Sequence, residues 1–188
     1  MFELDVALET ELELDGVIYL VNMAFDNILK LFKILDSPLL NDYEKICFGI
    51  KTLLGTELEL APQDQVEVFH YLLDNFVNQG SKKEVAVDLG GNPMPVKRQA
   101  ATQDLKHDAS YIYNSFRQAY RINLFEEQGK LDWREFLSLL RGLPDDTEYK
   151  KIIDIRTRPY QKGKGVSEAN RKLREAKRAY ALPGVEVE

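Results

Sequence analysis

The sequence predicts a mainly α-helical fold, with an N-terminal β-hairpin followed by about six to seven helices in a helical bundle. Near the N-terminus apolar and polar residues alternate around an Asp15-Gly16 dipeptide, which is the pattern of a hairpin. From Phe25 onward apolar residues recur every three or four positions, which is the period of an amphipathic helix. With 44% apolar and 30% charged residues, the composition is typical of a soluble globular protein.

The hairpin is expected over about residues 3–22. The first helix that follows has an apolar face that includes Phe25 and Phe32, and Ser37-Pro38 stops it. Asn41 opens the second helix, with Glu44 in capping-box spacing and Gly55 near the end. Pro62 stands in the first turn of a third helix. We expect residues 1–79 to form a compact acidic unit.

Residues 80–104 contain Gly90-Gly91, Pro93 and Pro95 without a sustained period, which predicts a linker or mobile loop. Residues 105–158 form the predicted C-terminal helical part, in which Asp145 or Asp146 can cap a helix. Residues 159–188 form a basic C-terminal arm with a helix from Ser167 to Ala181 whose apolar face is thin.

Charge is distributed unevenly along the chain. The net charge is -6, but residues 1–80 hold 4 basic and 15 acidic side chains (-11), whereas residues 81–188 hold 21 basic and 16 acidic ones (+5). A solvated surface is the default interpretation of this asymmetry, and the alternative is that it steers self-association between the acidic half and the basic arm, or a charged partner. The single cysteine, Cys47, fits a small core residue in a reducing cytoplasm. No segment has the roughly 18 consecutive apolar residues of a membrane span, and the acidic N-terminus is neither a signal nor a transit peptide.

The stretch EEQGKLDWREFLSLL, residues 126–140, superficially resembles half of a calcium-binding EF-hand. With Gly129 at loop position six, the first ligand position falls on Leu124, which has no oxygen to offer. Gly129 and Lys130 are therefore predicted to form a turn between helices. His70 and His107 lack a zinc-binding pattern, and His107, Asp108 and Ser110 are crowded in sequence rather than set up to converge. We expect no metal, no cofactor and no enzymatic activity.

The segment DASYIYNSFRQAYRINLFEEQGKLDWREFLSLLRGLPDDTEYKKIIDIRTRP, residues 108–159, resembles the "gp fifteen" family of tailed phages and prophages of Gram-positive bacteria. The LDGVIYLVNMAFDNILKLFKIL and LLNDYEKI stretches resemble the family's hairpin and first helices. Two positions depart from its pattern. Arg121 stands where many members have glycine, and Arg134 replaces a second aromatic residue.

The resemblance implies a tail assembly chaperone that coats the tape-measure protein in the cytoplasm of the bacterial host and keeps it soluble during tail morphogenesis. Other tail assembly factors, and further copies of this chain, are the other partners that we expect. A structural tail-completion or adaptor protein of the virion is the alternative, and a DNA-binding regulator using the basic arm is a weaker one. Trp133 either anchors its helix in the core or faces a partner. Eight residues are predicted to bind a partner: Trp133, Phe136, Arg141, Arg156, Arg158, Arg171, Arg174 and Arg178.

Overall fold

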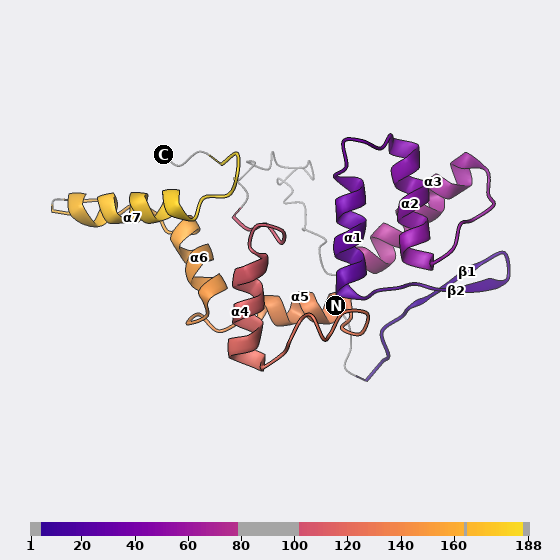
Figure 1. Cartoon of the computed structure of the whole chain (residues 1–188), viewed down its shortest axis with the longest axis horizontal. Helices are drawn as coiled ribbons and strands as arrows, with labels where there is room; N and C mark the ends of the chain where they lie inside the picture. The colour runs from indigo at the N-terminus through magenta and orange to yellow at the C-terminus, as the bar shows by residue number, and fades with distance from the viewer. Residues whose placement is uncertain (1–4, 79–101, 164, 186–188) are drawn as a thin grey trace, which may run out of the picture. The chain divides into compact units, whose positions relative to one another are not determined.

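The computed structural model describes residues 5–78, 102–163 and 165–185 (Figure 1). These residues contain seven α-helices, one π-helical turn and a two-stranded antiparallel sheet, so the predicted fold class is confirmed. They form two compact units: unit 1 comprises residues 5–78 and 127–139, and unit 2 comprises residues 102–126 and 140–185. Most of the predicted linker 80–104 lies outside the described residues, and the predicted segment boundaries stay predictions.

Unit 1 begins with the hairpin, formed by β1 (Glu11–Leu14) and β2 (Val17–Leu20). Asp15 and Gly16 both have positive φ, 51° and 76°, which suits the twist of a two-residue hairpin turn. The strands are shorter than the expected range of 3–22, although the Val21 amide donates to the Thr10 carbonyl at 2.7 Å beyond them.

Three helices follow the hairpin: α1 (Phe25–Leu35), α2 (Asp42–Leu54) and α3 (Pro62–Leu72). The chain then continues as a π-helical turn, η1 (Leu73–Val77). The predicted capping box is present, because the Glu44 amide donates to the Asn41 side chain and the Asn41 amide donates to the Glu44 carboxylate, both at 2.9 Å. Gly55 ends α2 with φ of 71°. These caps set the length of α2, one of the two helices that line the site described below.

Gly49 brings α2 close to its two neighbouring helices. A Cβ atom at this position would lie 2.5 Å from the Phe69 ring of α3 and 3.2 Å from Leu31 of α1. Only glycine permits this approach without movement of the Phe69 ring. The three helices thus share a buried core that includes Ile28, Leu31, Ile50, Leu53, Phe69 and Leu72.

Residues 127–139 join unit 1 through backbone pairing with the segment before α1. The Phe25 amide donates to the Leu131 carbonyl at 2.9 Å, and the Trp133 amide donates to the Met23 carbonyl at 2.7 Å. The turn predicted at Gly129 is confirmed, with φ of 74°, and its amide donates to the Asp26 carboxylate at 2.8 Å. Helix α5 (Trp133–Arg141) starts immediately afterward.

Arg134, which takes the place of the expected aromatic residue, is buried in unit 1 with 3% of its surface exposed. Its guanidinium donates to both Asp132 carboxylate oxygens, at 3.0 and 2.8 Å, and to the Glu9 carbonyl at 2.9 Å. A fully paired guanidinium of this kind fixes the segment before β1 onto the start of α5.

Unit 2 contains α4 (Ala109–Tyr120), α6 (Glu148–Thr157) and α7 (Ser167–Ala179), with α4 packed against α6. Arg121 ends α4 with φ of 59°, the left-handed conformation in which glycine is favoured. The expectation that Asp145 or Asp146 caps α6 is wrong. The N-cap position is occupied by the buried Thr147, which makes no side-chain cap to the helix, and its hydroxyl donates backward to the Pro144 carbonyl at 2.6 Å. Asp145 and Asp146 are exposed and precede the cap position.

Candidate protein-binding site

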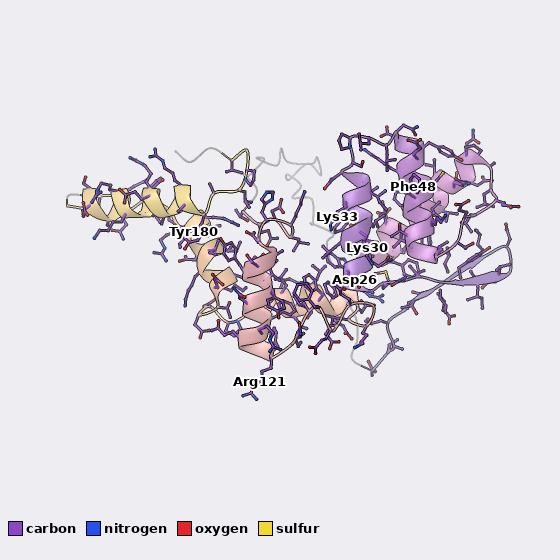
Figure 2. All side chains as sticks on the ribbon, in the orientation of Figure 1. Asp26, Lys30, Lys33, Phe48, Arg121 and Tyr180 are labelled. Atoms are coloured by element: carbon purple, nitrogen blue, oxygen red, sulfur yellow. The ribbon has the colours of Figure 1, made fainter. Side chains whose placement is uncertain are left out.

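Unit 1 carries a hollow between α2 and the segment that leads into α3, with a volume of about 310 Å³. We call it the α2–α3 groove. Ile50 and Leu58, both buried, form its apolar floor, and the exposed rings of Tyr43 and Phe48 stand at its edge. Its complete lining is Tyr43, Glu44, Cys47, Phe48, Ile50, Lys51, Glu57, Leu58 and Gln65. Figure 2 labels Phe48 on α2.

Gln65 of α3 holds the wall of the groove in place. Its side-chain nitrogen donates to the carbonyls of Leu58 and Leu60 at 2.9 and 3.3 Å. Its side-chain oxygen accepts from the Tyr43 hydroxyl at 3.1 Å and from the Cys47 thiol at 3.2 Å. The amide is therefore committed on both sides, and the hollow is preformed rather than dependent on a bound partner.

Charges stand at the rim of the groove. Lys51 and Glu57 form an ion pair at 2.7 Å, and Glu44 is engaged by its capping role at Asn41. The Lys51 ammonium keeps the pKa of Glu57 below its usual value. An apolar floor with carboxylates at the edge is suited to an apolar anchor residue that is flanked by cations.

Trp133 and Phe136 lie in the core of unit 1, with 3% and 2% of their surfaces exposed. Their rings stack with centroids 5.6 Å apart, and Phe32 meets Trp133 edge-on at 5.6 Å. The indole N–H donates to the Val77 carbonyl at 3.1 Å. Trp133 therefore anchors its helix in the core of unit 1 and does not face a partner.

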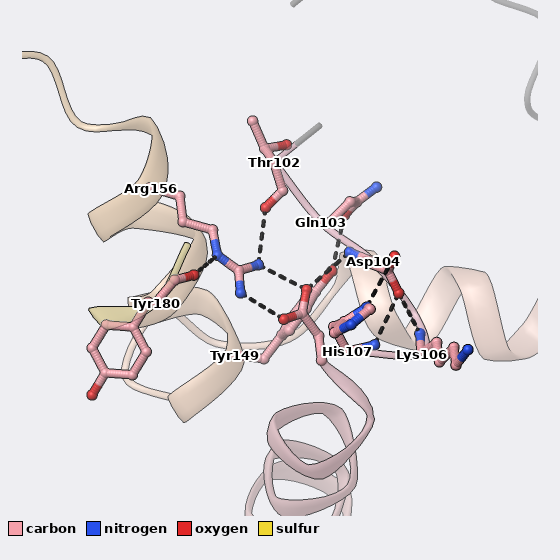
Figure 3. Close-up of polar contacts among 9 residues, drawn as sticks. Thr102, Gln103, Asp104, Lys106, His107, Tyr149, Arg156 and Tyr180 are labelled. Carbon is pink, nitrogen blue, oxygen red and sulfur yellow. Dashed lines mark hydrogen bonds and ion pairs between the residues drawn. The ribbon is translucent and has the colours of Figure 1, made fainter. Parts of the chain in front are cut away.

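Arg156 is also enclosed, in unit 2, where it pairs with the fully buried Asp108 (Figure 3). Its two terminal nitrogens lie 2.7 and 2.8 Å from the Asp108 carboxylate oxygens. The guanidinium also donates to the Tyr180 carbonyl at 2.6 Å and to the Thr102 carbonyl at 3.2 Å. Asp108 occupies the N-cap position of α4 but makes no side-chain cap to that helix, and its carboxylate accepts from the Asp104 amide at 2.9 Å. This pair fastens the entry to α4, the end of α6 and the residue after α7.

Tyr149 lies beside the same ion pair and donates from its hydroxyl to the Gln103 side chain at 2.9 Å (Figure 3). Burial, with a further contribution from the Asp108 carboxylate, raises its pKa to about 12, although the nearby Arg156 opposes the shift. Its ring therefore stays neutral and packed throughout the physiological pH range.

The other predicted arginines lie at the surface of their elements. Arg141 is exposed, and its carbonyl accepts from the Lys150 ammonium at 2.9 Å. Arg158 pairs with Asp154 within α6 and its C-terminal flank, where both side chains are more than half exposed. Arg171, Arg174 and Arg178 are exposed on α7. Among the eight predicted residues, these five remain accessible on their own elements, and their role in binding stays a prediction.

Sequence reasoning missed the groove itself. By helical period Tyr43 and Cys47 fall on the apolar stripe of the second helix, and Gln65 belongs to no motif. Phe48 was the available signal, because it is a large aromatic residue that falls outside that stripe and is 46% exposed. The groove depends on the path of residues 55–61, which periodicity does not describe.

Two further properties concern the described part of the chain. None of its helices combines the length and the apolar character needed to cross a lipid bilayer. In the same residues, no group of three or more histidine, cysteine or acidic side chains is arranged to hold a metal ion.

Comparison with known proteins gives a family match that spans nearly the whole chain. The family model described as Bacteriophage Gp15 protein matches residues 5–182. No curated protein and no solved structure matches significantly. The match includes both the groove-bearing unit and the unit that carries α7. The chain therefore belongs to the Bacteriophage Gp15 protein family.

Proposed function

We propose that this protein is a tail assembly chaperone that binds the phage tape-measure protein and keeps it soluble in the host cytoplasm during tail morphogenesis. The observation that carries the proposal is the preformed α2–α3 groove with its exposed aromatic rim. Membership of a bacteriophage family supports the phage context.

The size of the groove indicates how such a target would engage. About 310 Å³ holds one or two large apolar side chains and is too small for a whole helix. An amphipathic helix would therefore lie across the opening and insert anchor residues at i and i+3 or i+4. Phe48 and Tyr43 would cover the flanks of such an anchor and exclude water from it.

A single shallow groove binds weakly, but a tape-measure protein offers a long repetitive helical surface. Many copies of the chaperone along one target would gain avidity, because each bound copy raises the effective concentration of the next. Weak individual contacts also allow the copies to be displaced when tail-tube subunits arrive.

Co-expression with the tape-measure protein of the same phage tests the proposal. The wild-type chain is expected to keep the tape-measure protein in the soluble fraction and to co-purify with it. Phe48→Asp, which places a charge at the groove edge, should abolish both effects. Leu39→Asp is the matched control, since Leu39 is 90% exposed and does not line the groove.

Equal rescue by wild type and Phe48→Asp would remove the groove from the mechanism. Failure of the wild-type chain to rescue solubility would contradict the chaperone function itself. Abundant copies in purified mature particles would instead favour the structural tail-completion or adaptor role.

A further inference from the structure

The solvent face of the hairpin in unit 1 is apolar along one strand and acidic along the other. Ile18 and Leu20 of β2 point outward and are 63% and 69% exposed. The strand register places Leu20 opposite Glu11 and Ile18 opposite Glu13. Glu9, two residues before Glu11, is exposed as well. We call these five residues the hairpin face.

The hairpin face has no internal partner for its charge in the described residues. Glu9, Glu11 and Glu13 form no ion pair there, and no lysine or arginine occurs in the sequence before Lys30. Unit 1 as a whole holds 6 basic and 17 acidic side chains among its described residues, a net charge of -11. Exposed apolar side chains of this size beside unpaired carboxylates are typical of a surface that a cationic, amphipathic partner covers.

Unit 2 offers such a partner in α7. None of the 13 residues of α7 is buried, so the helix presents most of its surface to solvent. Arg171, Arg174 and Arg178 recur at i, i+3 and i+7 and therefore share one face, which we call the arginine face. The described residues of unit 2 hold 14 basic and 9 acidic side chains, a net charge of +5.

The helix is held near both ends, and the side chains of the arginine face nevertheless stay exposed. Near its start, Asn170 exchanges two hydrogen bonds with the Gln161 backbone, both at 2.9 Å. The Lys177 ammonium donates to the Arg156 carbonyl at 3.2 Å, and the Tyr180 ring meets Tyr111 edge-on. Arg174 lies over the Tyr160 ring at 5.6 Å. Arg171 pairs with Glu168 and Glu175 on the same helix, in contacts whose side chains are all 60% exposed. Because exposed ion pairs contribute little to stability, Arg171 can leave these two glutamates at little cost and pair with a better-placed carboxylate.

The two faces match in spacing as well as in charge. Alternate residues of an extended strand are about 7 Å apart, so Glu9 to Glu13 span about 14 Å. Arg171 and Arg178 are separated by about 10 Å along a helix axis, and arginine side chains reach several ångströms further. The methylene stems of the arginines can lie on Ile18 and Leu20 while the guanidinium groups reach the glutamates.

We propose that the arginine face of α7 in one copy docks on the hairpin face of a second copy. Each copy then contributes one face to each of two neighbours, which is a heterologous, head-to-tail arrangement. The contact area is small, so the association is expected to be weak and to weaken further as salt screens the charges. This inference is independent of the α2–α3 groove and of what binds there.

Sedimentation velocity of the full chain at low salt, over a wide range of protein concentration, tests the contact. The wild-type chain should form species larger than a dimer that dissociate at high salt. The hairpin variant, Glu9→Gln/Glu11→Gln/Glu13→Gln, and the helix variant, Arg171→Gln/Arg174→Gln/Arg178→Gln, should each weaken association at least about tenfold. An equimolar mixture of the two variants should form a heterodimer that does not grow, because only one intact pair of faces remains.

The matched control for the hairpin variant is Glu59→Gln/Asp64→Asn/Glu67→Gln. It also removes three negative charges, but from exposed residues outside the hairpin face. It should associate like the wild type. Far-ultraviolet circular dichroism checks that each variant is folded. A monomeric wild type, unchanged association of either variant, or a mixture that stays monomeric would overturn the proposal. Loss of association in the hairpin variant alone would instead indicate pairing between two hairpins.

Discussion

Arg156 and Asp108 are separated by 48 residues in the sequence and meet through two parallel hydrogen bonds, at 2.7 and 2.8 Å. Asp108 has no exposed surface, and the Arg156 side chain retains 9%. The guanidinium also donates to the Tyr180 and Thr102 carbonyls, so each of its three nitrogens has a hydrogen-bond acceptor. A buried ion pair of this kind mainly specifies which segments come together, because its desolvation offsets much of its attraction.

Arg156→Gln should destabilise unit 2 by about 3–5 kcal/mol, because it leaves the Asp108 carboxylate buried without its counter-charge. Arg158→Gln, which removes an exposed pair with Asp154, is the matched control and should cost about 1 kcal/mol or less. Urea unfolding monitored by circular dichroism measures both. Similar urea midpoints for the two variants would show that the buried Arg156–Asp108 pair contributes no more to the stability of unit 2 than an exposed pair does.

Trp133→Phe should lower the stability of unit 1 by about 1–3 kcal/mol, because the buried Val77 carbonyl loses its donor. Trp133 is the single tryptophan of the chain, so its fluorescence reports on unit 1 alone. The wild-type emission should be blue-shifted and resistant to iodide quenching. A red-shifted, readily quenched emission would contradict the inward placement of the ring.

Arg121→Gly should stabilise the chain by up to about 1 kcal/mol, since glycine adopts positive φ without the strain that Arg121 bears at 59°. Arg117→Gly, four residues earlier within α4, should have the opposite sign and cost about 1 kcal/mol. Thermal unfolding distinguishes the two. Destabilisation by both substitutions would show that the Arg121 side chain contributes more than its backbone strain costs.

Tyr149 is expected to ionise only near pH 12, whereas an ordinary tyrosine ionises near pH 10. The folded state therefore holds the phenolic proton more tightly than the unfolded state does. The stability this contributes is present below about pH 10 and is lost as the pH rises from 10 through 12. Absorbance titration at 295 nm should show a step near pH 12 that is missing in Tyr149→Phe. A Tyr149→Phe titration curve that retains the late step would assign it to another tyrosine.

Asp26 should contribute an acid-dependent component to the stability of unit 1. Burial raises its pKa, but the Gly129 amide and the Lys30 ammonium outweigh burial and hold the pKa below the ordinary 3.8. The contribution is therefore present above pH 3.8 and is lost as the pH falls from there through the lower, folded value. Asp26→Asn, which keeps an oxygen acceptor for Gly129, should lose this pH dependence. Urea-unfolding midpoints of the wild type and of Asp26→Asn, measured above and below this pH window, test the prediction. An identical change of midpoint with pH in the two proteins would contradict it.

The elements that sequence reasoning located are those specified by neighbouring residues. The Asp15-Gly16 turn, the Asn41–Glu44 capping box and the glycine at position 129 each follow from local backbone chemistry, and all three are present. Arg121 extends the same logic, because the resemblance marked the position as one for glycine and the structure gives it positive φ.

What local chemistry does not specify is which distant groups meet. Arg156 looks like one more member of a basic stretch until the fold brings Asp108 to it. Thr147, rather than either neighbouring aspartate, occupies the N-cap position of α6, and its burial is a property of the whole unit that the local sequence does not state. The groove at Phe48 likewise exists only after the segment before α3 has folded back on α2.

The return of residues 127–139 to unit 1 has a consequence for synthesis on the ribosome. Residues 5–78 are made first, yet Met23, Ala24 and Phe25 must wait for Leu131 to Trp133 before their backbone pairing is complete. During that interval the surface that Trp133 and Phe136 later cover is open to solvent. Because the chain is synthesised from its N-terminus, the ribosome must add about 60 more residues after residue 78 before unit 1 can complete its core. At usual translation rates this takes several seconds.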